Sequence, residues 1–189
     1  MVRTLCVLWL KLTGWKFINN VPDDIRSFVA LGVPHTSNFD FFPGVAASKL
    51  MKRNARFVIK SEWMKFPFSL IMKPAGAIGL DREKLKDGSK NTTDAMADLF
   101  KEYKELVLLI APEGTRSPRA EWKTGFYFIA QKAGVPIVLG FADYEKKEYG
   151  IGKVIYPTDF EKDMREIMNY YRNIKGKRPE NFLLDTRFS

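Results

Sequence analysis

The sequence predicts a single α/β domain in which helices flank a mostly parallel mixed sheet. Short apolar runs alternate with longer segments of helical periodicity along the chain, which is the pattern of a layered α/β fold. The short runs are continuously apolar rather than alternating, as strands are when both faces of their sheet are buried. The composition, with 46% hydrophobic and 28% charged residues in a chain of 189 residues, is typical of one globular domain.

The expected strands are short apolar segments that end at a turn residue. The clearest begins at Leu106 and contains six apolar residues before Pro112 stops it. Pro136 opens the next strand, and Gly134 before it is suited to end a helix. In chain order, the expected strands cover residues 27–33, 56–59, 77–80, 106–111, 136–141 and 153–156, and the expected helices cover 39–51, 89–104, 124–133 and 160–173.

Residues 1–20 form an expected amphipathic segment with two interpretations. The apolar run from Leu5 to Leu10 gives about 9 Å of helix against about 30 Å of hydrocarbon in a bilayer, so no transmembrane helix is expected. Helical spacing is shown by four apolar residues, Leu5, Leu8, Trp9 and Leu12. This stripe either packs on the core or forms an interfacial helix, whose Trp side chains and flanking cations Arg3, Lys11 and Lys16 suit a headgroup layer.

The charge of the chain favours anionic partners. It has 31 Lys and Arg against 22 Asp and Glu, a net charge of +9. Residues 49–73 hold seven of the basic residues and one acidic residue, interleaved with large aromatic side chains. Such a surface suits phospholipid headgroups, nucleic acid or an acidic carrier protein, although it is also compatible with a plain solvated face. Cys6 is the only cysteine, so neither a disulfide within the chain nor a metal site is expected.

His35, the only histidine, follows an expected strand directly, where the loops of a parallel sheet carry chemistry. If the next helix begins at Ser37 or Asn38, the loop can fold the imidazole back onto Asp40. A carboxylate there would fix the orientation of the imidazole and leave its other nitrogen free as a base near neutral pH. The alternative is that Ser37 and Asp40 form a capping box, which needs no catalysis.

Two further segments are suited to anion binding. After the 106–111 strand, Gly114 permits a tight turn, Thr115 can donate to an anion, and Arg116 can hold a phosphate with two hydrogen bonds. The 77–80 strand leads to Arg82 in the same way. The alternatives are a polar turn that closes a buried strand, and an exposed Arg82 that pairs with a neighbouring carboxylate.

Together, and in this order, these segments resemble the glycerolipid acyltransferase family. The family's H-x-x-x-x-D block is matched by His35 and Asp40, its glycine-containing segment ending in Arg by residues 76–82, and its F-P-E-G-T-R-S block by residues 112–117, with Ala111 in place of Phe. Residues 135–138 match its V-P-[IV] strand, although Leu139 and Gly140 stand where the family has a second Pro. The resemblance implies one acyltransferase domain over residues 1–189, with a motif-bearing core at 28–141 and a glycerol-3-phosphate acyltransferase-like fold.

The resemblance also implies an activity in phospholipid biosynthesis. A fatty acyl group would move from acyl-CoA or acyl-carrier protein, as co-substrate, to a hydroxyl of a lysophospholipid such as 1-acylglycerol 3-phosphate (lysophosphatidic acid). His35 would be the general base and Asp40 would orient it. The acceptor pocket would be lined by Arg82, Glu113, Gly114, Thr115 and Arg116 and bordered by Thr36 and Ser37. Neither a metal nor an organic cofactor is implied.

The same reading expects a peripheral or monotopic enzyme on the cytoplasmic face of a membrane, with an anionic lipid surface as partner. Its lipid contact would be an aromatic patch of Trp63, Phe66, Phe68, Leu70 and Ile71 with Lys65 and Lys73. Ala111 and the missing second Pro motivate an alternative, an O-acyltransferase of the same fold acting on a lyso-aminolipid or another acceptor without phosphate. A second alternative is a non-enzymatic module that binds anionic membranes or nucleic acid, but no nucleic-acid recognition motif is present, so nucleic acid is not expected.

Overall fold

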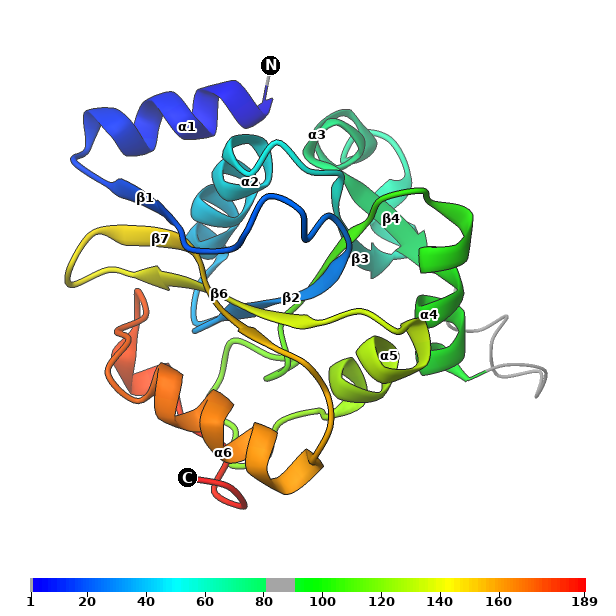
Figure 1. Cartoon of the computed structure of the whole chain (residues 1–189). Helices are drawn as coiled ribbons and strands as arrows, with labels where there is room; N and C mark the ends of the chain where they lie inside the picture. The colour runs from blue at the N-terminus through cyan, green and yellow to red at the C-terminus, as the bar shows by residue number, and fades with distance from the viewer. Residues whose placement is uncertain (1, 81–90) are drawn as a thin grey trace.

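A computed structural model describes residues 2–80 and 91–189 (Figure 1). Their strands form one sheet in the order β1-β7-β6-β2-β5-β3-β4. The bounds are β1 Lys16–Asn19, β2 Phe28–Val33, β3 Ala55–Lys60, β4 Ala77–Leu80, β5 Val107–Ile110, β6 Ile137–Asp143 and β7 Glu148–Ile155. The strands from β6 to β4 are mutually parallel, whereas β7 runs antiparallel to β6 and β1 runs parallel to β7. The predicted mostly parallel mixed sheet is confirmed.

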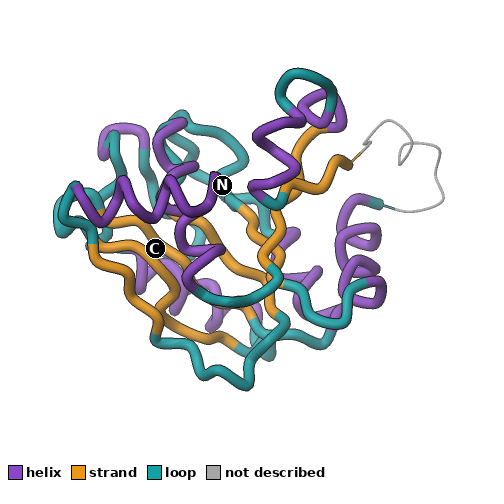
Figure 2. Tube along the Cα trace, turned by 90° about the horizontal axis from the view of Figure 1, so that it is seen from above, coloured by secondary structure: helices purple, strands orange, loops and turns teal. Residues whose placement is uncertain are grey.

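Helices cover both faces of this sheet, which is continuous and twisted when it is seen from above (Figure 2). The bounds are α1 Val2–Leu12, α2 Phe41–Leu50, α3 Ser69–Ala75, α4 Thr92–Glu102, α5 Gly125–Ala133 and α6 Phe160–Tyr171, with short 3₁₀ helices η1 Asn38–Asp40, η2 Ser61–Met64 and η3 Pro179–Asn181. In Figure 1, α1 to α3 lie above the sheet and α4 to α6 lie below it.

The two sides of the sheet bury two separate apolar clusters. One includes Leu31 together with side chains of α4, α5 and α6, and the other includes Ala30 together with side chains of α1, α2 and α3. Because successive residues of a strand point to opposite faces, β2 feeds both clusters. Its residues are buried almost throughout, which explains why the sequence of this strand is apolar without alternation.

The elements predicted from apolar runs are present, with differences at the irregular places. The last strand begins at Glu148 rather than at residue 153, and β1 and α3 were not predicted. The sequence of β1 has only four residues, and α3 contains Pro74, a residue that normally breaks a helix. The predicted helix over 89–104 is described from Thr92 onward, and its first residues lie outside the described part of the chain.

A glycine explains why β1 can join the sheet edge. Gly150 on β7 has a φ of 149°, and a Cβ at that position would collide with the backbone carbonyl of Ile18 on β1. Only glycine combines this backbone conformation with so close an approach. The early part of β7 is therefore fixed by a backbone contact that no apolar pattern records.

Helix α1 packs on the core through a different face from the predicted stripe. Cys6 and Leu10 are buried, and the Arg3 guanidinium donates to the carbonyl of Ala75 at 3.2 Å. The predicted stripe is exposed instead, with exposed fractions of 58% for Leu5, 52% for Leu8, 43% for Trp9 and 77% for Leu12. Arg3 therefore points inward rather than toward a headgroup layer. Within residues 2–80 and 91–189, every helix is too short or too polar to cross a membrane.

Candidate active site

The loop after β2 places His35 beside Asp40. The 3₁₀ helix η1 begins at Asn38, and Ser37 is its N-cap, with the full capping box that the sequence offered as the alternative. Asp40 Oδ2 accepts the backbone N–H groups of Thr36 and Ser37, each at 2.7 Å. The same oxygen lies 3.7 Å from His35 Nδ1. The capping box and the His–Asp pair are therefore the same structure, because the carboxylate that caps the helix also faces the imidazole.

His35 is held as a neutral base at neutral pH. Burial is the main cause that lowers the pKa of its imidazole, the positive charge of Arg116 lowers it further, and Asp40 opposes both. The His35 side chain is 27% exposed, whereas that of Asp40 is only 6% exposed. The gap of 3.7 Å is longer than a hydrogen bond, and such pairs commonly tighten when substrate binds.

Glu113 joins the two loops from behind the site. Its Oε1 accepts the backbone N–H of His35 at 2.8 Å, and its side chain is buried with 5% of the residue exposed. Burial raises the pKa of this carboxyl to about 7, although the hydrogen bond from His35 acts in the opposite direction. The carboxyl therefore fixes the backbone at His35.

The turn after β5 presents Gly114, Thr115 and Arg116 to a cavity. Gly114 adopts a left-handed φ of 66°, and a Cβ at that position would lie 2.9 Å from Cε of Lys123. The left-handed backbone conformation favours glycine at this position, and the flexible side chain of Lys123 lies over the turn.

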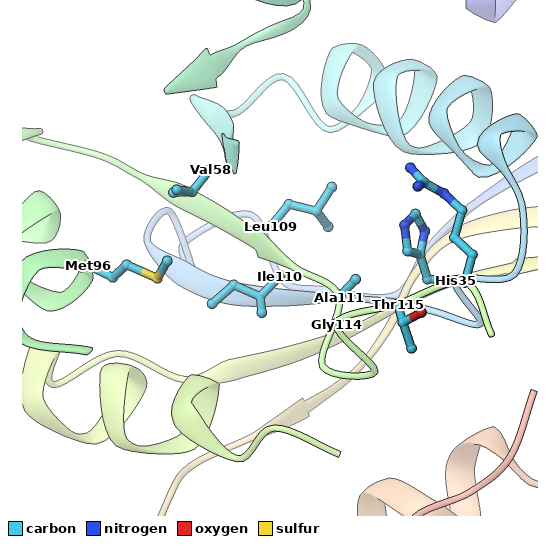
Figure 3. Close-up of a pocket in the computed structure, with 9 residues that line it drawn as sticks. His35, Val58, Met96, Leu109, Ile110, Ala111, Gly114 and Thr115 are labelled. Carbon is cyan, nitrogen blue, oxygen red and sulfur yellow. The ribbon is translucent and has the colours of Figure 1, made fainter. Parts of the chain in front are cut away.

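The cavity has a volume of about 250 Å³ and two unlike ends (Figure 3). Figure 3 shows His35 and Thr115 at one end, with Met96 and Val58 at the other. Its lining consists of His35, Val58, Met96, Leu109, Ile110, Ala111, Gly114, Thr115 and Arg116. A basic, hydrogen-bonding end thus continues into an apolar end, as an amphiphilic substrate would require.

The predicted site residues differ in what they contact in the structure. His35, Gly114, Thr115 and Arg116 line the cavity, and Asp40 lies behind His35. The others that are described are used inside the protein, because Thr36 Oγ1 accepts the backbone N–H of Arg178 at 3.2 Å, Ser37 caps η1, and Glu113 holds the His35 backbone. Arg82 lies outside the described residues. The acceptor-binding roles of these residues remain predictions.

Sequence reasoning missed Tyr144 and Lys177. The Tyr144 side chain lies beside Asp40, and burial, followed by the effect of that carboxyl, raises the pKa of its hydroxyl. Its ring packs edge-on against Trp15 at 4.8 Å, and Nζ of Lys177 lies 5.6 Å from its centroid. Both residues are more than a hundred positions from His35 in the sequence and lie outside every motif, so no spacing signal could have identified them.

The part of the chain that the structure describes offers no cluster of three His, Cys, Asp or Glu side chains that could hold a metal ion. The described residues at the cavity supply an imidazole base, a carboxylate behind it, and an arginine with a hydroxyl and backbone groups at the same end.

Comparison with known proteins identifies the family of the chain. No curated protein matches the chain in a sequence search. The family model for acyltransferases, however, matches residues 19–138, well over half of the chain, and this range holds His35, Asp40 and the Glu113–Arg116 turn. The family is that of glycerolipid acyltransferases such as 1-acylglycerol-3-phosphate O-acyltransferases. The chain belongs to this acyltransferase family and is an enzyme that transfers an acyl group to a lipid.

Proposed function

We propose that this acyltransferase moves a fatty acyl group from a thioester donor to a hydroxyl of a lysophospholipid such as 1-acylglycerol 3-phosphate, in phospholipid biosynthesis. The observation that carries the proposal is the imidazole of His35, backed by Asp40 at 3.7 Å and opening into the same cavity as Arg116. One cavity thus contains a base for a hydroxyl and a cation for a phosphate.

The proposed reaction is a single transfer that uses no acyl-enzyme. Nδ1 of His35 faces Asp40, so Nε2 takes the proton of the acceptor hydroxyl while its oxygen attacks the thioester carbonyl carbon. The carbon–sulfur bond then breaks, and the departing thiolate takes the proton from the imidazolium. Asp40 stabilises the imidazolium that exists between these two proton transfers, as the carboxylate does in other hydroxyl-activating pairs. The thioester, from acyl-CoA or acyl-carrier protein, is a co-substrate, and no step uses a cofactor.

The two ends of the cavity suit the two ends of the acceptor. Arg116, with Thr115 and the Gly114 turn, is suited to a phosphate, and we assign Arg82 the same role by family position. At the other end, Val58, Met96 and Ile110 give an apolar wall for an acyl chain. The lyso-aminolipid alternative differs in needing no phosphate contact at Arg116.

Removing the Arg116 charge tests this assignment. Arg116→Gln is expected to raise KM for lysophosphatidic acid by about 10–100-fold, the value of one or two hydrogen bonds to a charged group. A lyso-aminolipid acceptor without phosphate is expected to show no change in KM. Initial rates of thiol release with each acceptor give both constants. Arg119→Gln is the matched control, because Arg119 is an exposed arginine on the same loop, as Arg116 is, but does not line the cavity.

Two results would contradict the phosphate assignment. An equal loss with both acceptors would mean that Arg116 acts on the reaction without recognising phosphate. A wild-type enzyme that prefers the phosphate-free acceptor would favour the lyso-aminolipid activity.

We further propose peripheral attachment to an anionic membrane, at its cytoplasmic face, through an apolar face. This apolar face consists of Leu5, Leu8, Trp9 and Leu12 on α1 and Trp63, Phe66, Phe68, Leu70 and Ile71 around α3, all of them exposed. Helices α1 and α3 are in contact, and the exposed cations Lys11, Lys65 and Lys73 lie on the same segments. Apolar side chains with basic neighbours suit the boundary between headgroups and acyl chains.

An aromatic path connects the apolar face to the catalytic loop. The ring of Trp9 on α1 lies 5.2 Å from that of Phe42, which in turn lies 5.9 Å from that of Phe39. Phe39 belongs to η1, between His35 and Asp40 in the sequence, and is 51% exposed. An amphiphile drawn from the lipid layer would therefore meet apolar surface all the way to the loop that carries the base.

A further inference from the structure

The chain after α6 places a group of cations next to the catalytic loop. Four exposed basic residues, here called the tail cations, are Arg172, Lys175, Lys177 and Arg178. They lie beyond the range 19–138 that the family model covers. In residues 2–80 and 91–189, no carboxylate forms an ion pair with any of them. Four positive charges therefore stand within seven residues, with no carboxylate partner among the residues that the structure describes.

Backbone contacts fix this segment against the residues next to His35. The backbone N–H of Arg178 donates to Thr36 Oγ1 at 3.2 Å, and the backbone N–H of Tyr144 donates to the carbonyl of Lys175 at 2.8 Å. A Cβ on Gly176, between the lysines, would lie 2.8 Å from Thr36 Oγ1. The tail cations are thus mounted on a backbone that touches the residue following His35.

One of the cations is also positioned through its side chain. Nζ of Lys177 lies 5.6 Å from the ring centroids of both Phe39 and Tyr144. The faces of these rings attract a cation within about 6 Å. The ammonium group is therefore held over the loop that contains Asp40 and beside the Tyr144 side chain that faces that carboxyl.

We infer that the tail cations bind the phosphate groups of coenzyme A in the thioester donor. The inference rests on the proposed function, because it supposes a thioester whose carbonyl carbon must reach His35. The cavity of about 250 Å³ holds the reacting groups and part of an acyl chain, so the phosphorylated part of the donor remains outside it. A group of four cations in one segment that touches the catalytic loop suits a polyanion in charge.

The acceptor phosphate, an anionic membrane and an acidic carrier protein are the other anionic partners, and each fits the tail cations less well than coenzyme A does. Arg116 lines the cavity, where the acceptor phosphate is proposed to bind. The apolar face lies on α1 and α3, whereas the tail cations follow α6 in the chain, and Lys177 lies over Phe39, at the far end of the aromatic path from α1. An acidic carrier protein would need a docking surface of about 800 Å² on the enzyme. One segment of seven residues provides much less surface than that.

The test compares two thioesters that differ only in the phosphorylated part. Lys175→Glu/Lys177→Glu is assayed with acyl-CoA and with the corresponding acyl-pantetheine, which has no phosphate. The expected result is a KM for acyl-CoA at least 10-fold higher, with unchanged KM for acyl-pantetheine and for the lipid acceptor. The decrease of kcat/KM for acyl-CoA with added salt should also become weaker. Lys175→Glu alone, which keeps the backbone bond to Tyr144, provides the same comparison if the double variant fails to fold.

Lys52→Glu/Lys104→Glu is the matched control, since it makes the same charge change at two exposed residues. These residues precede β3 and β5, at the amino ends of the parallel strands, whereas the catalytic loop lies at the carboxyl ends. An unchanged KM for acyl-CoA in the tail variant would overturn the inference. So would an effect confined to acyl-carrier protein, or a loss of binding to anionic vesicles with equal effects on both small thioesters.

Direct binding separates this inference from the proposed function. Calorimetry with coenzyme A alone is expected to show binding by the wild type that is at least 10-fold weaker in the tail variant. This result would support the tail cations even if no thioester were turned over, in which case only the proposed function would fail. Turnover that requires His35 but is insensitive to the tail variant would overturn only the present inference.

Discussion

His35 is flanked by two charges that act on its basicity in opposite directions. Burial is the first cause that lowers the pKa of the imidazole, Arg116 lowers it further, and Asp40 raises it. A general base works only in its neutral form. The pH at which kcat/KM falls on the acid side of the pH–rate profile therefore depends on how Arg116 and Asp40 shift the pKa of His35.

The predicted pH dependence has opposite signs for the two neighbours. In the wild type, kcat/KM falls as the pH drops through the pKa of His35, which lies below its ordinary value of 6.5. Arg116→Gln removes a repelling positive charge, so the imidazolium is stabilised and the limb moves to higher pH. Asp40→Asn removes the attracting charge and moves the limb to lower pH. Profiles of kcat/KM for the three proteins provide the measurement, and shifts in the same direction would be inconsistent with this account.

The sequence predicted which residues gather near His35 better than it predicted how each is used. Glu113 was assigned to the acceptor pocket, but its carboxyl lies under the catalytic loop and binds the N–H of His35. Motif order cannot show which side of a turn faces a cavity. That depends on the packing of two loops 78 residues apart. The acceptor role of Glu113 remains a prediction, whereas its bond to the loop is part of the structure.

Helix α1 illustrates what periodicity can and cannot establish. The sequence predicted a helix there, and α1 spans Val2–Leu12. It could not establish which side packs inward, because apolar residues surround the helix. The buried side uses Cys6 and Leu10, while Leu8 and Leu12 are exposed. Helix α3 was not predicted because Pro74 interrupts its pattern.

The exposed stripe of α1 is predicted to bind lipid. Leu8→Gln/Leu12→Gln is expected to reduce co-sedimentation with anionic vesicles by at least about 10-fold, since burying each leucine contributes about 1.5–3 kcal/mol. The melting temperature should change little, because both side chains are already exposed. The control is Tyr156→Gln/Leu183→Gln, at exposed positions outside α1 and α3. Equal vesicle binding by the two variants would refute a lipid-binding role for α1.

At the scale of the whole molecule, the sheet order brings the motifs together. Strand β2 lies between β5 and β6, so the loops after β2 and β5 leave neighbouring strands at the same edge. The sequence predicted a parallel sheet, and with it chemistry at the carboxyl ends of the strands. It could not predict the strand order, because continuously apolar strands carry no register or neighbour preference. It also missed the contact of Tyr144 and residues 175–178 with the catalytic loop.

The fold also brings the surfaces on which the proposed reaction depends to one catalytic loop. The apolar face lies on the side of α1 and α3, the tail cations follow α6, and His35 opens into the cavity at the carboxyl edge of the central strands. The apolar face and the tail cations therefore both reach the catalytic loop, the first through Phe39 and the second at Phe39 and Thr36. This arrangement is consistent with direct transfer, in which both substrates are bound at once.

The measurement that tests the central claim most directly is acceptor-dependent thiol release from acyl-CoA by wild type and His35→Ala, with lysophosphatidic acid on vesicles. Loss of the general base is expected to lower kcat by about 10²–10⁴-fold. Vesicle binding and the circular dichroism spectrum should be unchanged, and Cys6→Ser, at the only cysteine, should retain wild-type turnover. Turnover that survives in His35→Ala, or thiol release that does not depend on the acceptor, would contradict His35 as the base for acyl transfer to a lipid hydroxyl.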